Sequence, residues 1–219
     1  MIPIRDTIPS SRIPFVTWSI VIANTLFFFI EVSLPDLEVA SLLFTYGLVP
    51  SLVISGEASL LTFVSSTFLH GSWMHLIGNM WILFIFGDNV EDILGHFRFA
   101  IYYILWGIMA NLMQFIFMMR FGGPIIGASG AIAGVMGAYL WFFPSSRILT
   151  LIPLLFIYIP LYIPAYIYLI IWFFLQFFNG ITTALGRAFS SVAWWAHVGG
   201  FIAGYNMARL FESRKRSVK

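Results

Sequence analysis

Long apolar runs separated by short polar stretches dominate the chain. Six of these runs are predicted to be helices that cross a membrane. The pattern therefore predicts an all-α polytopic membrane protein with one membrane domain over residues 1–219. The predicted spans cover about residues 14–33, 73–86, 97–119, 128–143, 162–178 and 190–211.

Two apolar stretches do not fit simple crossings. Residues 34–70 are too hydrophobic for an ordinary loop, so this outer connection is expected to lie partly in the membrane interface. Residues 148–178 form an apolar run longer than one crossing, and its first half contains Pro153, Pro160 and Pro164. Because proline interrupts helices, we place the span at 162–178 and treat 148–161 as a hydrophobic interfacial segment.

The fourth predicted span is short. Its 16 residues correspond to about 24 Å of helix at 1.5 Å per residue, whereas the hydrocarbon core is about 30 Å thick. Either its start lies below the membrane surface or the helix does not reach both faces.

The acidic stretch from Asp88 to Asp92 is expected to be the turn that closes the second span.

Composition narrows the class of protein further. The 219 residues are 60% hydrophobic and 9% charged, against about 25% charged in soluble domains, so little chain remains for a soluble domain. A net charge of +2 gives no reason to expect nucleic acid as a partner. The absence of cysteine excludes disulfide and thiolate chemistry. With 4 His and 9 acidic residues, neither a metal site nor a cofactor is expected.

The basic residues orient the predicted helices. Six spans place both termini on one side, together with nine of the Lys and Arg residues, whereas only Arg120 and Arg187 fall on the other side. By the positive-inside bias the termini are cytoplasmic, and the 34–70 connection faces outward. The lack of Cys and the short chain suggest the plasma membrane of a prokaryote.

Candidate chemistry begins with the stretch Ile125–Ala138, which reads IIGASGAIAGVMGA. Glycines recur there every three or four residues, which lets neighbouring helices approach closely in a membrane. Ser129 lies near the predicted first turn, where backbone N–H groups have no partner within the helix. A hydroxyl beside free donors suits acyl transfer through an oxyanion, although a serine in a packing motif is the simpler interpretation.

Three other polar residues are predicted to reach the same depth. His75 and Asn79 share a helix face just inside the outer end of the second span, and His197 lies about seven residues into the sixth. The small residues beside His197, in the sequence AHVGG, would pack on the glycine face of the fourth span and bring His197 to Ser129. Ionisable groups inside spans mark function more often than packing. The simpler alternatives are a packed histidine and an interhelical hydrogen bond from asparagine.

The sequence gives less reason to assign a function to the remaining two histidines. His70 lies at a helix end and is expected to be interfacial, with a smaller chance of a direct role. His96 falls in a cytoplasmic turn beside Arg98 and is expected to be solvated.

Together these motifs resemble those of the rhomboid intramembrane serine proteases. The resemblance is carried by GASG at Gly127–Gly130, by HGSWMHLIGNM around His75 and Asn79, and by AHVGG at Ala196–Gly200, all in the family's order and spacing. It implies a six-helix bundle of the rhomboid type.

The resemblance also implies roles for individual residues. Ser129 matches the nucleophile and His197 the general base of the family. His75 and Asn79 match the side chains that hold the oxyanion, together with backbone N–H groups near Ser129, at Gly127 and Ala128. One departure matters, because some members carry an aromatic residue at the position of Ala133 that stacks on the catalytic histidine.

We therefore expect an intramembrane serine endopeptidase with a Ser–His dyad, acting on single-span membrane proteins within the lipid bilayer. No acidic residue is placed to orient His197, so the dyad should depend on its oxyanion donors. Two alternatives remain, an inactive rhomboid-like scaffold that binds membrane proteins and, less favoured, a small transporter. The sequence does not specify the oligomeric state.

Overall fold

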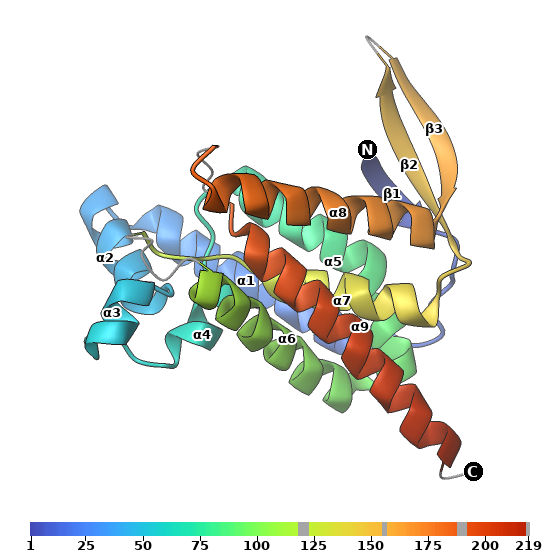
Figure 1. Ribbon diagram of the computed structural model, residues 1–219, viewed down its shortest axis with the longest axis horizontal. Coiled ribbons are helices and arrows are strands. Elements are labelled where there is room, and N and C mark those ends of the chain that lie inside the picture. The colour runs from blue at the N-terminus through green and yellow to red at the C-terminus, as the bar shows by residue number, and fades with distance from the viewer. Residues whose placement is uncertain (118–122, 155–156, 188–191, 218–219) are drawn as a thin grey trace.

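The computed structural model describes residues 1–117, 123–154, 157–187 and 192–217. Helices dominate these residues, and a small sheet projects from one end of them (Figure 1). The long helices are α1 (Phe15–Ser33), α5 (Trp73–Leu94), α6 (His96–Phe117), α7 (Ser129–Phe142), α8 (Ala165–Ala184) and α9 (Trp194–Ser217). The short helical segments are α2 (Asp36–Tyr46), α3 (Pro50–Ser55), α4 (Thr62–Ser65) and η1 (Ser66–Phe68). The strands are β1 (Ile2–Asp6), β2 (Arg147–Leu154) and β3 (Ile157–Pro164).

Helix α7 lies at the centre, packed against α5, α6 and α9 (Figure 1). Every residue from Gly130 to Tyr139 is buried, because small side chains let the neighbouring helices close in. On α9, a Cβ atom at Gly200 or Gly204 would collide with backbone carbonyl groups of α7. The small-residue faces predicted from the sequence therefore do pack together, with two backbones in near contact.

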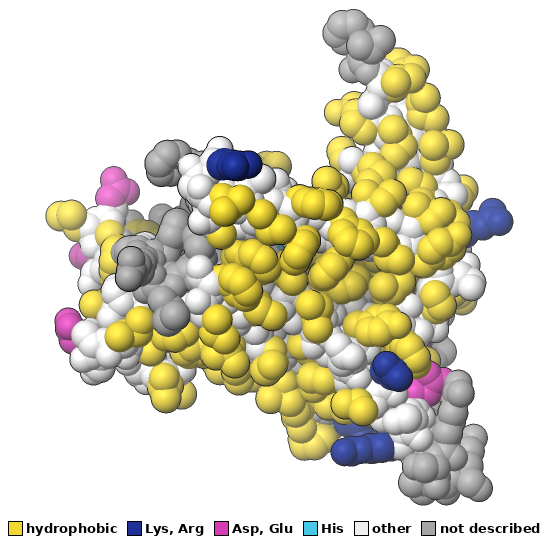
Figure 2. Space-filling model, viewed as in Figure 1, with side chains coloured by type: hydrophobic (Ala, Val, Ile, Leu, Met, Phe, Trp, Pro, Cys, Tyr) yellow, Lys and Arg dark blue, Asp and Glu magenta, His cyan; other side chains and the backbone are white. Residues whose placement is uncertain are grey.

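The apolar helices make this chain a multi-pass membrane protein. Among the described residues, α1, α6 and α8 are long and apolar enough to cross a membrane, and α7 is a shorter apolar helix. The 14 residues of α7 correspond to about 21 Å of helix at 1.5 Å per residue. Large apolar side chains cover much of the face in Figure 2, as expected for a surface in contact with lipid.

The predicted acidic turn after the second span is wrong. Helix α5 continues through Asp88 and Glu91 to Leu94 and ends at Gly95, which adopts a positive φ of 76°. The carboxylate of Glu91 is buried and accepts hydrogen bonds from the backbone N–H groups of Val16 and Thr17 at 2.9 and 2.8 Å. It thus satisfies otherwise free donors at the start of α1.

His96 keeps part of its predicted solvent exposure, with 42% of its side chain accessible. Its Nδ1 contacts the buried Glu91 carboxylate, so this imidazole is bound to the end of α5 and is only partly solvated.

The prediction of an all-α chain is wrong at the interfacial segment 148–161. Most of that segment belongs to the antiparallel hairpin β2–β3, and β1 pairs with β2 to give the strand order β1–β2–β3. The predicted fifth span also begins too early, since Tyr162 belongs to β3 and α8 starts at Ala165. β-branched and aromatic residues between the prolines favour strands here.

The connection 34–70 contains α2, α3, α4 and η1. It also positions the loop before α7. Leu48 and Ile125 exchange two backbone hydrogen bonds of 3.0 and 2.8 Å, and the N–H of Gly127 donates to the carbonyl of Ser66 at 2.9 Å. These contacts fix the approach of the chain to Ser129.

Candidate functional site

Ser129 and His197 come together from two helices. Ser129 is the first residue of α7, and His197 lies in the first turn of α9. The Ser129 Oγ and the His197 Nε2 are 2.8 Å apart, within hydrogen-bonding range. Ser129 is half-buried, whereas His197 is 9% exposed. Close packing of α7 on α9 at Gly130 and Gly200 brings the two side chains together.

His75 and Asn79 approach this pair from α5. Ser72 caps that helix by accepting a hydrogen bond from the His75 N–H at 3.2 Å. Asn79 is buried, and its Nδ2 lies 2.9 Å from His70 Nε2. An amide nitrogen carries two hydrogens, so a second hydrogen remains after this bond.

His70 packs against the two side chains that α5 contributes to the site. It is buried, and its backbone N–H points to the Glu31 carboxylate at 3.2 Å. Its ring packs edge-on against the ring of His75, with the centroids 5.0 Å apart. His70 thus contacts both side chains that the sequence analysis assigned to the oxyanion.

Gly127 and Ala128 form the approach to α7. Gly127 has a φ of 119°, and a Cβ atom there would lie 2.7 Å from His75 Nε2. Only glycine combines that backbone conformation with so close a neighbour. Ala128 is fully buried, next to Ser129. The Gly127 N–H, however, donates to the Ser66 carbonyl at 2.9 Å. It is therefore not free to hold an oxyanion as the sequence analysis predicted.

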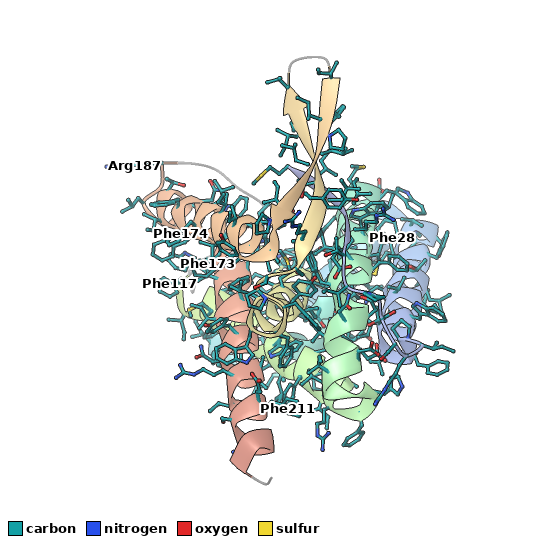
Figure 3. The ribbon with its side chains drawn as sticks, turned by 90° about the vertical axis from the view of Figure 1, so that its right-hand side faces the viewer. Phe28, Phe117, Phe173, Phe174, Arg187 and Phe211 are labelled. Atoms are coloured by element: carbon teal, nitrogen blue, oxygen red, sulfur yellow. The ribbon has the colours of Figure 1, made fainter. Side chains whose placement is uncertain are left out.

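The sequence analysis missed two residues on α8. Gln176 Oε1 lies 2.9 Å from His197 Nδ1, and Gln176 Nε2 donates to the Trp172 carbonyl at 3.1 Å. The Trp172 ring lies beside the imidazole, with centroids 5.8 Å apart at an angle of 32°. Figure 3 shows α8 lying across the upper end of α9, with the aromatic residues Phe173 and Phe174 on α8. A lone Gln within an apolar span was the signal that could have identified Gln176.

A cavity of about 650 Å³ opens onto these groups. Its polar lining includes Ser129, His197, His75, Asn79 and Gln114. Gln114 also accepts a hydrogen bond from the Ala196 N–H at 3.1 Å, which satisfies a donor at the start of α9. Apolar side chains also line the cavity, among them Met74, Ile125 and Ile126. The hydroxyl and the imidazole are therefore both reachable from one partly apolar cavity.

Comparison with known proteins agrees with the motifs. A family model described as the Rhomboid domain matches residues 57–214. Rhomboid-like protein 11, chloroplastic, from Arabidopsis thaliana is 40% identical over 73 residues, which are 33% of this chain and 26% of that protein. Presenilin-associated rhomboid-like protein, mitochondrial, from Homo sapiens is 35% identical over 85 residues, 38% of this chain and 22% of that protein. RHOMBOID-like protein 6, mitochondrial, from Arabidopsis thaliana is 31% identical over 100 residues, 43% of this chain and 32% of that protein.

These alignments span less than a third of each relative's length. Their names place the relatives in mitochondria and chloroplasts, and they lend no support to the prokaryotic plasma membrane suggested by the cysteine-free sequence. The family model, by contrast, covers well over half of this chain. The chain therefore belongs to the rhomboid family.

Proposed function

We propose that the protein is an intramembrane serine endopeptidase that cleaves transmembrane segments of other membrane proteins near the outer membrane face. The observation that carries this proposal is the 2.8 Å contact between Ser129 Oγ and His197 Nε2 at the wall of a 650 Å³ cavity. A hydroxyl and an imidazole at this distance are the minimum required for nucleophilic catalysis.

The reaction proceeds in two halves. Ser129 Oγ attacks the scissile carbonyl carbon while His197 Nε2 takes the hydroxyl proton, and a C–O bond forms as the carbonyl π electrons move to oxygen. His197 then gives the proton to the leaving amine nitrogen as the C–N bond breaks, which leaves an acyl-enzyme on Ser129. Water, activated by His197, hydrolyses this ester and restores the hydroxyl.

The developing oxyanion requires donors opposite the imidazole. The remaining Asn79 amide hydrogen and the His75 ring line the cavity, and we propose that first-turn N–H groups of α7, which have no partner within the helix, complete the set. Such preorganised donors each contribute about 10²–10³ in rate in other hydrolases.

The proposed membrane arrangement has six spans, α1, α5, α6, α7, α8 and α9, with both termini in the cytoplasm. Both termini lie away from α2, α3 and α4 in Figure 1, and the start of α7 faces those segments. The basic residues near the C-terminus of α9 support the same orientation. The dyad then lies below the outer surface, where a cavity gives water access to it.

The proposed substrates are single-span membrane proteins that enter from the bilayer. A helical substrate must unwind locally, because its peptide groups are otherwise hydrogen-bonded within the helix. Polar lining groups such as Gln114 and Ser72 could bind the exposed peptide groups.

The test uses the purified protein in vesicles with a panel of single-span proteins. Ser129→Ala and His197→Ala should each lower cleavage below detection, whereas Ser145→Ala, an exposed serine beyond α7, should cleave normally. Cleavage by Ser129→Ala at the rate of the unmodified protein would reject the proposal. Substrate binding without cleavage by the unmodified protein would favour the scaffold alternative.

A further inference from the structure

The second ring nitrogen of His197 has a defined partner. Gln176 can present either its oxygen or its nitrogen to Nδ1, and the distance of 2.9 Å alone does not choose. The other end of the same amide lies 3.1 Å from the Trp172 carbonyl, which can only accept. The amide nitrogen therefore faces Trp172, and the oxygen faces His197.

This arrangement selects one tautomer of the neutral imidazole. Because Gln176 Oε1 can only accept, Nδ1 must carry the hydrogen. Nε2 then presents its lone pair to the Ser129 hydroxyl at 2.8 Å. In the opposite tautomer Nε2 would carry a hydrogen and could not take the serine proton.

The geometry points to Gln176 as the positioning residue of His197, so that α8 must be docked on α9 for the dyad to work. This inference rests on the proposed function. No described acidic side chain contacts His197, and the family's stacking position is occupied by Ala133. Trp172 and Trp194 flank the ring instead, at centroid distances of 5.8 and 6.0 Å.

The buried environment of position 176 explains why an amide, and not a carboxylate, occupies it. A carboxylate beside His197 would have to be buried among apolar side chains, which costs several kcal/mol in the absence of an ion pair. Gln176 is buried at 7% exposure and needs no counter-charge. It fixes the tautomer while leaving stabilisation of the imidazolium to the rest of the site.

The position of Gln176 beside His197 depends on how firmly α8 is held against α9. Only Ala165, Tyr168, Leu169, Gln176 and Gly180 are buried among its 20 residues. A helix with so much exposed surface is held by fewer contacts than α7. Any displacement of α8 from α9 would withdraw Gln176 and Trp172 together, while Ser129 stayed in place.

The test compares steady-state cleavage by Gln176→Met, Gln176→Glu and a neighbouring control on α8, Leu175→Met. Gln176→Met removes the acceptor at nearly constant size, so kcat should fall about 10- to 100-fold with KM within about twofold, less than the ~10⁴-fold loss on tautomer reversal in a triad. Gln176→Glu keeps an acceptor oxygen for Nδ1 but loses the donor to the Trp172 carbonyl, so its kcat should lie between those of Gln176→Met and the unmodified protein. Leu175→Met should match the unmodified protein.

Two results would overturn the inference: an unchanged kcat in Gln176→Met, or a Gln176→Glu variant as slow as Gln176→Met. If Gln176→Met does not accumulate, Gln176→Asn withdraws the same oxygen by one methylene and should show the same loss of kcat. Activity in Ser129→Ala would instead refute the proposed function, so the two failures are distinguishable.

A separate observation concerns the hairpin β2–β3, which is apolar on both faces. Adjacent residues in a strand point to opposite faces, yet Leu161 and Tyr162 are 48% and 50% exposed, and Ile157 and Tyr158 are 61% and 60% exposed. The sequence has no Lys, Arg, Asp or Glu between Arg147 and Arg187. Exposed apolar surface of this extent indicates an interaction site.

The direction of the hairpin identifies what it contacts. It extends across the direction of α7 and α8 and beyond the bundle (Figures 1 and 3). A segment perpendicular to membrane-crossing helices runs along the membrane plane. Its base adjoins β1 at the N-terminus, so it lies on the face of the membrane that holds both termini.

We also infer that this hairpin inserts flat into the interfacial layer of the bilayer on the side of the termini. Tyr158 and Tyr162 suit that layer, where tyrosine is enriched. The free edge of β3 requires water or headgroups for its backbone groups, which excludes the hydrocarbon centre. Pro160 and Pro164 remove N–H donors from β3, which disfavours pairing with a second copy.

The test exploits the cysteine-free chain. A spin label on Leu161→Cys or Ile157→Cys, in protein reconstituted into phosphatidylcholine vesicles, should collide more with oxygen than with a water-soluble nickel complex. A label on the exposed Glu57→Cys should show the reverse. Nickel contact at the hairpin equal to that at residue 57, or dipolar broadening between labels of two copies, would overturn the inference.

Discussion

Helices α7 and α8 are both apolar, but they occupy opposite positions in the packing. Helix α7 is built from small residues, and every residue from Gly130 to Tyr139 is buried. Helix α8 carries large aromatic and aliphatic residues, and most of its side chains remain outside the core. Side-chain size, more than hydropathy, therefore decides which apolar helix becomes the centre of this protein.

The difference divides the candidate site into two parts. The hydroxyl of Ser129 belongs to the buried helix, and His75 and Asn79, the proposed oxyanion donors from α5, pack against the loop before it. Gln176 and Trp172, which surround the far side of His197, belong to the peripheral helix. Substitutions on the α7 side should thus lower activity or stability more than substitutions on the α8 side.

The largest effect is expected for Asn79→Ala on the α7 side. Loss of this proposed oxyanion donor should lower kcat about 10²–10³-fold, more than any change on α8. Steady-state cleavage of a reconstituted substrate measures this, with the exposed Asn206→Ala on α9 as the control. A loss smaller than that of Gln176→Met would reverse the proposed ranking.

A glycine pair compares the packing of the two helices directly. In Gly137→Ala the new Cβ would meet the backbone carbonyl of Phe201, whereas in Gly180→Ala it would lie 3.1 Å from the edge of the Trp195 ring. Overpacking should cost Gly137→Ala about 1–3 kcal/mol, and the α8 variant should lose clearly less. Thermal unfolding in detergent measures both, and equal losses would contradict the packing difference.

A smaller effect is expected for Trp172→Leu. The ring packs on His197 without a hydrogen bond to it, so kcat should fall about two- to tenfold, in line with aromatic pair energies of 0.5–1.5 kcal/mol. Trp18→Leu, on the exposed side of α1, serves as the matched control. An effect as large as that of Asn79→Ala would show that α8 holds the imidazole more firmly than its packing suggests.

The smallest effect concerns the far end of α7, where the Tyr139 hydroxyl and Asn89 Nδ2 donate to Asp6. Burial raises the pKa of Asp6 from 3.8 to about 6, with a further contribution from nearby Asp88. The folded protein therefore holds this proton more tightly than the unfolded chain, and stability should fall as pH rises from about 4 to above 6.

The measurement is the thermal midpoint between pH 4 and pH 7. Asp6→Asn removes the titrating group and should flatten this part of the profile. An unchanged slope in Asp6→Asn would contradict the assignment of the pH dependence to Asp6.

The core of the site was predictable because its signals are local. Glycines at regular spacing in Ile125–Ala138 and the AHVGG sequence near His197 specify which helix faces meet. Their contact places Ser129 against His197 within hydrogen-bonding range. Because helix packing relates these two short patterns, together they predict that Ser129 and His197 lie close together.

Other features depend on contacts between distant segments and were missed. Gln176 is an isolated polar residue, and its role depends on how α8 sits against α9. The extension of α5 depends on Glu91 capping α1, which lies 75 residues earlier in the chain. The prolines of 148–161 were interpreted as helix breaks, but the β2–β3 pairing that replaces the helix depends on cross-strand contacts.

The most direct test of the central claim is labelling of the reconstituted protein by a fluorophosphonate, with the modified residue identified by mass spectrometry. The account predicts that the label forms on Ser129 and is lost in His197→Ala, because the hydroxyl reacts only when the imidazole takes its proton. Labelling of Ser129 at an unchanged rate in His197→Ala, or no labelling of Ser129 in the unmodified protein, would contradict it.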